Sequence, residues 1–294
     1  MGEGASAARR ARRACGGARV TLLALAELGR GVVDRDTPVL YADDEGVLRG
    51  RSVFETLRVY RGVPFELEAH LARLAASAER LRLPEPPRDE LTQLAREAVD
   101  AAAAPDAALR FLWTAGREGV GVPAGLALVS TLPPGLDELR SRGLRLAVTE
   151  WAPGALAGAK STSYAANMRA QDDALRAGAD DALLVGLDGA VLEAPTSNVW
   201  FREGRTLHTP ELSLPLLAGV TRAVIARLAP VGGYTVEEGR YELERLLRAD
   251  EVFVSSSVRE IVPVVAIDDT EIPRGPAAPA LQAALREAAG YPGG

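Results

Sequence analysis

The sequence predicts a two-domain α/β (α+β) protein, and three observations support this fold class. The chain has 294 residues, of which 47% are hydrophobic and 25% charged, enough for one large core or two ordinary ones at about 100 to 200 residues per domain. Strand-like and helix-like segments alternate along most of it. Pro133-Pro134-Gly135 and the charged stretch 136–143 interrupt that alternation midway. We therefore expect an N-terminal α+β domain at 20–131, a linker at 132–143 and a C-terminal domain at 144–294.

The first element is a tail. Residues 1–19 are mostly Gly, Ala and Arg without apolar periodicity, which is typical of a flexible segment. A secretory signal is the competing interpretation, because arginines precede the apolar residues 21–26. That run is short and has no convincing cleavage site, so the signal is the weaker reading.

The N-terminal half then alternates strands and helices. A helix at 68–83 is indicated by apolar residues three and four apart, and Pro84 ends it. A second helix is expected at 89–103. Period-two patterns and turn residues predict strands at 37–41, 53–60, 63–65, 108–113 and 125–129, with a turn at 43–46. Strands with two helices on one side make a compact α+β unit.

The C-terminal half continues in the same manner. Strands are expected at 144–148, 182–185, 199–201 and 251–254, and a strand end at 191–193. Helices are expected at 165–177, 221–228 and 278–289.

Composition excludes several classes of protein. Cys15 is the only cysteine, so no internal disulfide can form, and a cytoplasmic location is expected. No stretch approaches the roughly 20 apolar residues of a membrane-spanning helix. A net charge of −6 argues against a nucleic-acid partner. Two histidines and one cysteine cannot build a His-rich or Cys-rich metal site.

The basic residues single out one position. Of the 34 basic residues 33 are arginine, and the remaining one is Lys160. Arginine keeps its proton at any accessible pH, whereas lysine can lose one and attack a carbonyl as a neutral amine. Chance retention of a surface lysine is the alternative, so its neighbourhood must decide.

Four segments together suit one anionic cofactor. They are Lys160-Ser161-Thr162-Ser163-Tyr164, the carboxylate Glu193 at a strand end before a polar turn, Gly219-Val220-Thr221-Arg222 at a helix start, and Ser255-Ser256-Ser257-Val258 at another strand end. Free N–H groups at a helix start favour a phosphate. Taken singly, each segment is better explained as an ordinary structural feature: a surface lysine, a solvated acid, a helix cap or a polar turn. No G-x-x-x-x-G-K-[ST] motif occurs, and the glycines at 116–121 are expected in a strand connection.

The order and spacing of these segments resemble the fold-type IV pyridoxal-phosphate enzymes, the class IV aminotransferases. That family includes branched-chain and D-amino acid aminotransferases, R-selective amine transaminases and 4-amino-4-deoxychorismate lyases. Two N-terminal motifs agree: Gly50-x-x-Val53-Phe54-Glu55 is similar to the family's glycine, aromatic, glutamate signature, and Glu68-x-His70-Leu71-x-Arg73-Leu74 to its H-x-x-R-L helix. The resemblance covers roughly residues 37–285 and implies a small N-terminal α+β domain beside a larger barrel-like, cofactor-binding one.

The resemblance also implies roles for individual residues toward pyridoxal 5'-phosphate. Lys160 would form the Schiff base and move the substrate's Cα proton, Glu193 would pair with the pyridine nitrogen, and Tyr164 would bond the phenolic oxygen. The phosphate would be held by Arg73, Gly219, Val220, Thr221, Ser256 and Ser257. The substrate pocket would be bordered by Phe54, Val258, Arg259 and Arg51. The run Arg49-Gly50-Arg51-Ser52 and Arg259 depart from the family pattern, and they suggest an anionic substrate or ordinary surface arginines.

The function that the resemblance favours is amino transfer between an amino acid or amine and a 2-oxo acid. The alternative is 4-amino-4-deoxychorismate lyase, which releases pyruvate and leaves 4-aminobenzoate with the same lysine and cofactor. A catalytically inactive cofactor-binding protein is a third, disfavoured reading, because Lys160 is intact. The expected partners are small molecules and, by resemblance alone, a second copy of the chain in a homodimer.

Overall fold

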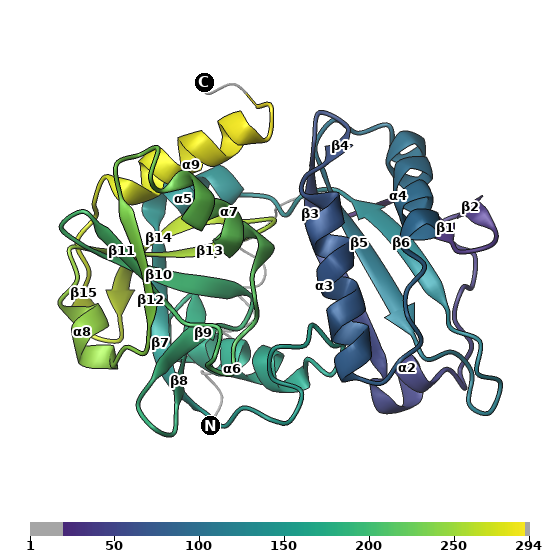
Figure 1. The fold of residues 1–294 in the computed structure, drawn as a ribbon, viewed down its shortest axis with the longest axis horizontal. Coiled ribbons are helices and arrows are strands. Elements are labelled where there is room, and N and C mark those ends of the chain that lie inside the picture. The colour runs from purple at the N-terminus through teal and green to yellow at the C-terminus, as the bar shows by residue number, and fades with distance from the viewer. Residues whose placement is uncertain (1–19, 292–294) are drawn as a thin grey trace, which may run out of the picture.

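The structure is a computed structural model that describes residues 20–291. Figure 1 shows two units side by side, a twisted sheet with two helices on one face and a barrel with helices around it. The predicted two-domain α/β (α+β) class is confirmed. The predicted tail at 1–19 lies outside the described residues. Among residues 20–291, no helix has both the length and the hydropathy that crossing a bilayer requires.

The first unit is an antiparallel six-stranded sheet in the order β2-β1-β6-β5-β3-β4. Its strands are β1 (Leu22–Glu27), β2 (Gly31–Val33), β3 (Ser52–Tyr60), β4 (Val63–Pro64), β5 (Ala107–Thr114) and β6 (Gly125–Ser130). Its helices are α2 (Glu45–Arg49), α3 (Leu67–Arg80) and α4 (Arg88–Ala102). The apolar faces of α3 and α4 pack with the sheet into one core, as their three-and-four spacing predicts.

Strand β3 presents two different faces because its side chains alternate. Val53, Leu57 and Val59 are fully buried in the core beneath the helices. Phe54 and Tyr60, on the other face, reach Lys160 and Glu260 of the second unit. One strand therefore spans the junction between the units.

The second unit contains a closed barrel. Strands β10-β13-β14-β7-β8-β9 are hydrogen-bonded in that order, and pairing of β9 with β10 closes the ring. The barrel strands are β7 (Leu144–Trp151), β8 (Asp181–Gly186), β9 (Val191–Ala194), β10 (Ser197–Glu203), β13 (Glu251–Ser256) and β14 (Glu260–Ile267). Strands β11 (Thr206–Pro210), β12 (Thr235–Gly239) and β15 (Thr270–Glu271) extend its edges. The expected barrel-like C-terminal unit is thus confirmed.

Helices cover the outside of this barrel. They are α5 (Leu136–Arg142), α6 (Ala165–Arg176), α7 (Val220–Leu228), α8 (Leu243–Leu247) and α9 (Ala277–Ala288). Alternation along β13 explains the two cores, because Val252 and Val254 fill the barrel while Phe253 packs with residues of α7 and α9.

Three local expectations differ from the structure. Residues 37–41 form no strand, and the expected turn at 43–46 includes the start of α2, whose first turn is capped by the Asp44 side chain. The apolar run at 21–26, considered as a signal segment, contributes most of β1. The stretch 132–143, expected as a linker, contains α5, and Gly135 and Gly143, both at positive φ, flank that helix.

Candidate active site

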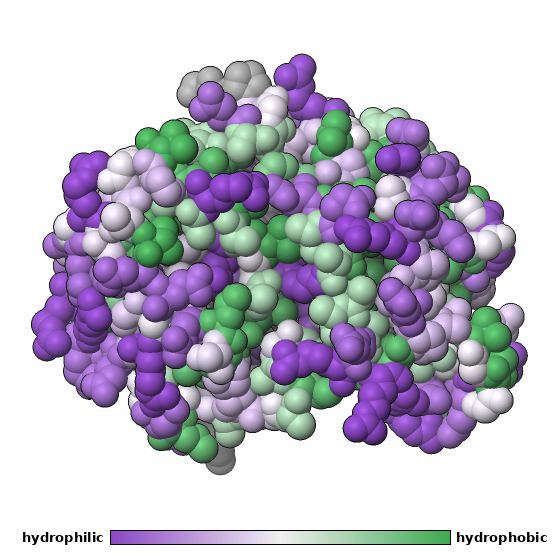
Figure 2. Space-filling model, viewed as in Figure 1, coloured by the Kyte–Doolittle hydropathy of each residue, from purple (hydrophilic) through white to green (hydrophobic). Residues whose placement is uncertain are grey.

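Lys160 lies on a segment that is fastened to the first unit. The Phe54 N–H donates to the Lys160 carbonyl at 2.9 Å, and the Thr162 N–H donates to the Ser52 carbonyl at 3.0 Å. Val53 and Ser161 form a β-bridge between these two bonds. The lysine is therefore held at the junction of the two units. Figure 2 shows that the surface is hollowed between these units.

The Lys160 ammonium has unusual surroundings. Its Nζ lies 4.6 Å from the centre of the Phe54 ring, and within residues 20–291 it forms no ion pair. Burial lowers the pKa of Lys160 to about 8, with nearby Arg73 lowering it further and Glu55 and Glu193 opposing. A substantial fraction of the amine is therefore neutral near physiological pH.

Glu193 on β9 is close enough to Lys160 for the charge of each to shift the pKa of the other. Its Oε2 accepts hydrogen bonds from the Leu217 N–H at 3.2 Å and from Asn198 Nδ2 at 3.3 Å. No guanidinium or ammonium of residues 20–291 comes within ion-pair distance of it. Burial raises the pKa of Glu193 to about 7, although the Leu217 N–H and the charges of Lys160 and Arg73 lower it. This carboxylate can accept a strong hydrogen bond from a ring N–H.

Tyr164 closes one side of the hollow. Its hydroxyl donates to the Pro195 carbonyl, and its ring meets the Phe54 ring edge-on at 5.6 Å between centroids. Burial, and then the negative charge of Glu193, raise the pKa of Tyr164, so its proton is retained. The predicted partner of the cofactor oxygen thus lies beside Lys160 and Glu193.

The start of α7 forms an anion-binding corner. Gly219 precedes it, and a Cβ there would lie 1.9 Å from Asn198 Oδ1, so a larger residue would displace that side chain. None of the described side chains caps this helix, which leaves the N–H groups of its first turn available. The Thr221 hydroxyl lies 3.4 Å from the Ser257 hydroxyl, and Ser257 lies 3.4 Å from His70 Nε2. The predicted residues Gly219, Val220, Thr221 and Ser257 are therefore brought together, with Ser256 next in the chain.

Arg73 on α3 reaches the same corner from the first unit. Its Nε and Nη2 each donate to the Glu55 carboxylate at 2.7 Å, and its Nη1 donates to the Ala218 carbonyl at 3.0 Å. Burial would raise the pKa of Glu55, but Arg73 and then His70 lower it to about 2. Arg73 is thus held rigidly beside the residue that precedes Gly219.

Two arginines expected at the substrate side are engaged elsewhere. Arg51 pairs with Glu45 of α2. Arg259 Nη1 lies 2.7 Å from Asp181 Oδ2, and that aspartate is almost fully buried. Val258 lies with Arg259 in the turn between β13 and β14. The guanidinium charges of both arginines are therefore compensated within the described chain.

Sequence reasoning missed Arg110. It lies on β5 opposite Thr56 of β3, donates to the Thr56 hydroxyl at 3.2 Å and sits 5.6 Å from the centre of the Phe54 ring. Its charge lowers the pKa of both Lys160 and Tyr164, yet it has no carboxylate partner among residues 20–291. The antiparallel register of β3 with β5 was the signal that could have placed it.

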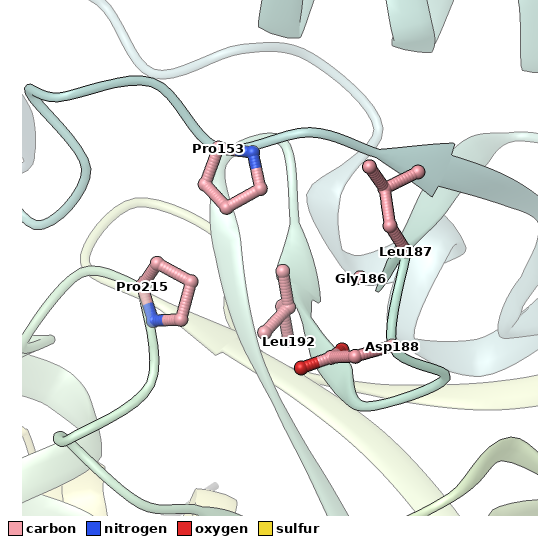
Figure 3. Close-up of a pocket in the computed structure, with 6 residues that line it drawn as sticks. All are labelled: Pro153, Gly186, Leu187, Asp188, Leu192 and Pro215. Carbon is pink, nitrogen blue, oxygen red and sulfur yellow. The ribbon is translucent and has the colours of Figure 1, made fainter.

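A separate recess lies on the second unit. It measures about 210 Å³ and is lined mainly by apolar residues, including Pro153, Leu192 and Pro215 (Figure 3). Leu192 and Glu193 are adjacent in a strand and point to opposite faces. None of the polar groups described above lines the recess, so it is distinct from the polar hollow.

Comparison with known proteins shows the family to which this chain belongs. The model of the family described as amino-transferase class IV matches residues 52–267, which is well over half of the chain. The chain belongs to the class IV aminotransferases. The resemblance predicted from the sequence is thereby confirmed.

Relatives of this class IV aminotransferase differ in their named activities. Aminodeoxychorismate lyase of Bacillus subtilis is 34% identical over 251 residues, covering 82% of this chain and 85% of the relative. A bifunctional aminodeoxychorismate lyase and D-amino acid transaminase of Mycobacterium tuberculosis is 34% identical over 260 residues, covering 82% and 90%. A solved fold IV transaminase from Curtobacterium pusillum has a TM-score of 0.84 at 33% identity, covering 92% of this chain and 98% of that one.

Pyridoxal phosphate is the cofactor of this class, and related structures include a pyridoxal-phosphate-bound form. The residues present fit that group. An uncapped helix start with Gly219 offers N–H donors to a phosphate, Lys160 offers a partly neutral amine, and Glu193 offers a carboxylate without a cation. The protein is therefore a class IV enzyme whose hollow has the donors and acceptors that this cofactor requires.

Proposed function

We propose that this enzyme transfers an amino group between an amino acid or amine and a 2-oxo acid. The observation that carries the proposal is the Lys160 amine, which lies 4.6 Å from the centre of the Phe54 ring and has a pKa lowered to about 8. A base of this strength can both take a proton from carbon and give it back near neutral pH. Amino transfer needs both steps.

The chain's own residues have distinct tasks in this proposal. When bound, pyridoxal phosphate supplies an electron sink for the charge left on the substrate's Cα. Lys160 Nζ takes the Cα proton and returns it, and Glu193 holds a proton on the pyridine nitrogen. Tyr164, whose hydroxyl donates to the Pro195 carbonyl in this structure, redirects that hydrogen bond to the phenolic oxygen and so orients the ring.

Binding and recognition fall to other residues. Arg73, the start of α7 at Val220 and Thr221, and the hydroxyls of Ser256 and Ser257 hold the phosphate. Phe54 and Val258 border the substrate. The uncompensated Arg110 attracts a substrate carboxylate, a task for which Arg51 and Arg259 are less suited because each already pairs with an acid.

The lyase reaction is the second candidate, and the similarity to the lyase of Bacillus subtilis favours it. The same Lys160 and cofactor would serve, but the product would be pyruvate and an aromatic amine, with no amino group passed to an acceptor.

One experiment separates the two candidates. Purified holoenzyme is assayed for pyruvate release from aminodeoxychorismate, and in parallel with L-amino acids, D-amino acids and R-amines plus 2-oxoglutarate. We expect amino-acid product from the second set and little pyruvate from the first. Pyruvate release with no transfer to any acceptor would reject amino transfer in favour of the lyase.

We also propose that the enzyme works as a homodimer. Support comes from apolar side chains, each more than half exposed, on two neighbouring segments of the first unit: Tyr41, Val47, Leu48, Val120 and Val122. These segments are joined by the ion pair of Asp43 with Arg117. Light scattering on the holoenzyme tests the proposal, and a mass of 31.0 kDa, that of one chain, would refute it.

A further inference from the structure

Glu260 is the first residue of β14 and has two unusual properties. Its φ is 60°, in the left-handed region that favours glycine, and it is completely buried. It follows the three-residue turn 257–259 directly, and it pairs in register with Ser256 on β13. The turn thus begins at Ser257, whose hydroxyl lies 3.4 Å from both the Thr221 hydroxyl and His70 Nε2.

Side chains from three other elements meet at the Glu260 carboxylate of β14. From β3 of the first unit, the Tyr60 hydroxyl donates to Oε1 at 2.6 Å and Arg58 Nη1 lies 3.0 Å away. From α5, Arg140 Nη2 lies 2.6 Å from Oε2. From α9, Gln282 donates to Oε2 at 2.7 Å and Arg286 at 3.1 Å. We call these five partners and Glu260 the Glu260 cluster.

The same cluster also holds the backbone beside the turn. Arg140 Nε donates to the Arg259 carbonyl at 3.2 Å, and the Ile261 N–H donates to Gln282 Oε1 at 3.0 Å. At the other end of the turn, the Ser257 hydroxyl approaches His70 and Thr221 in the anion-binding corner. Only two residues, Val258 and Arg259, therefore separate Glu260 from Ser257, a predicted phosphate contact.

Strand β3 provides a second connection between these places. Tyr60 and Arg58 lie on the same face of β3 as Phe54, and Phe54 contacts Lys160. Along the strand, Tyr60 is about 20 Å from Phe54 at roughly 3.3 Å per residue. The cluster and the cofactor region are thus linked both through the turn and through β3.

We propose that Glu260 is a positioning residue, whose carboxylate fixes the 257–259 turn against the first unit so that cofactor binding and docking of the two units are energetically coupled. The backbone conformation alone does not account for a glutamate here, since glycine would adopt it more readily. The carboxylate is required because it pairs with three guanidiniums, two of them on elements of the second unit and one on the first. The proposal concerns the cofactor of the family and does not depend on which reaction the enzyme catalyses.

The first test uses a mild variant with a matched control. Full-length apoenzyme is titrated with pyridoxal phosphate in the absence of substrate, and its Kd and Tm are measured. Tyr60→Phe removes one hydroxyl, 2% exposed, from the cluster, whereas Tyr241→Phe removes one, 6% exposed, that donates to the Glu237 carbonyl within the second unit. We expect Tyr60→Phe to raise Kd about three- to tenfold, the effect of one net hydrogen bond, and Tyr241→Phe to leave it within about twofold.

The second test separates backbone from side chain. Glu260→Gly keeps the left-handed conformation but loses the carboxylate, and Glu260→Gln keeps the shape but loses the charge. We expect both to raise Kd roughly tenfold or more. Asp268→Gly is the control, because Asp268 also has a positive φ, of 48°, in a turn that precedes β15 and lies outside the cluster. We expect its Kd to be unchanged.

Several outcomes overturn the proposal. If Glu260→Gly binds the cofactor as tightly as the wild type, the position needs only a left-handed residue. If Tm falls in the cluster variants while every Kd stays that of the wild type, the cluster is purely structural. Should the Glu260 variants fail to fold, Tyr60→Phe against Tyr241→Phe decides the matter by itself, and equal Kd values in that pair reject the coupling.

Discussion

Glu193 and Glu260 lie on opposite strands of the same barrel, and the surrounding residues shift the pKa values of the two carboxylates in opposite directions. Glu260 has three guanidiniums around it, and although burial raises its pKa, Arg58, Tyr60 and Arg140 hold the pKa below its ordinary range. Glu193 has only the Leu217 N–H and an amide as partners, so burial raises its pKa to about 7. A carboxylate paired with several guanidiniums, such as Glu260, fixes the fold. A carboxylate without a cationic partner, such as Glu193, remains able to bind a ligand.

The same contrast separates Lys160 from the arginines. Most arginines in the described chain pair with acids, whereas Lys160 lies against an aromatic ring without a counter-ion. We therefore expect ionisable side chains without a counter-ion to serve catalysis, and those paired with an opposite charge to serve stability.

The largest effect is expected for Lys160→Arg. A guanidinium keeps the positive charge but cannot form the covalent bond to the cofactor or exchange a proton near neutral pH, so kcat should fall by at least about a thousandfold. Turnover and covalent cofactor retention after borohydride reduction are measured, with circular dichroism to check the fold. No other lysine can substitute, and turnover near the wild-type rate would remove the basis of the proposed function.

Glu193→Gln should slow turnover by about a hundredfold while the cofactor stays bound. The amide cannot hold a proton on the pyridine nitrogen, but it leaves the phosphate contacts intact. Stopped-flow measurement of Cα proton removal and the cofactor Kd check both parts. Glu203→Gln, an acid that pairs with Arg245 away from the hollow, is the control and should change neither. If Glu193→Gln weakened cofactor binding without slowing Cα proton removal, Glu193 would act in cofactor binding, as proposed for Glu260, and the predicted difference between the two residues would be wrong.

Arg73→Ala tests a compensated cation at the edge of the site. Loss of the charge-assisted bonds should weaken cofactor affinity by roughly 1.5 to 3 kcal/mol, and excess cofactor should restore part of the activity. It also leaves the buried Glu55 with His70 as its remaining side-chain partner, so the free energy of unfolding should fall by about 3 kcal/mol. The exposed pair of Arg88 with Glu68 is the control, and Arg88→Ala should alter neither quantity measurably. Unchanged cofactor affinity in Arg73→Ala would contradict its predicted role.

The pH dependence of apoenzyme stability isolates the Lys160 contribution. The folded pKa of about 8 lies below the ordinary 10.5, so between these values the unfolded chain binds a proton that the folded chain does not. The free energy of unfolding therefore rises with pH across that window, and the penalty for a buried ammonium is complete below pH 8.

Comparison with Lys160→Met gives the measurement. The variant has no ammonium, so its apo form should have a higher Tm than the wild type below pH 8, and the gap should close towards pH 10.5. A gap that is independent of pH would show that Lys160 is not destabilised by its surroundings.

The sequence allowed much of the site to be predicted, but not the long-range contacts that connect it to the rest of the fold. Lys160, Tyr164, Glu193 and Gly219 sit in short motifs whose order and spacing predicted the site, and in the structure Glu193 is close enough to Lys160 and Tyr164 to shift the pKa of both. The Glu260 cluster joins residues up to 228 positions apart, from Arg58 to Arg286, and no local pattern reveals such a contact.

Local competition explains the misassigned elements. Residues 37–41 have a strand-like composition, yet Asp44 caps α2 just after them and directs the chain away from the sheet. The charged segment with α5 was read as a linker, because its buried function depends on Arg140 reaching Glu260 in a distant part of the chain. A local helix cap therefore overrode composition in the first case, and a tertiary contact did so in the second.

The smallest effect concerns the arginines near the substrate. The sequence suggested that Arg259 or Arg51 reads a distal carboxylate, but Arg259 pairs with Asp181 and Arg51 with Glu45. Arg110 is the cation that approaches Phe54 without a carboxylate partner among residues 20–291. Arg110→Ala should therefore raise KM for 2-oxoglutarate about five- to tenfold, the scale of one charge-assisted contact at a solvated site, and change KM for pyruvate less. Arg259→Ala and Arg51→Ala, measured in the same assays, should leave the ratio of the two KM values close to that of the wild type. If Arg259→Ala changes that ratio and Arg110→Ala does not, then a guanidinium already paired with a buried acid still recognises substrate, and charge compensation does not separate structure from chemistry in this protein.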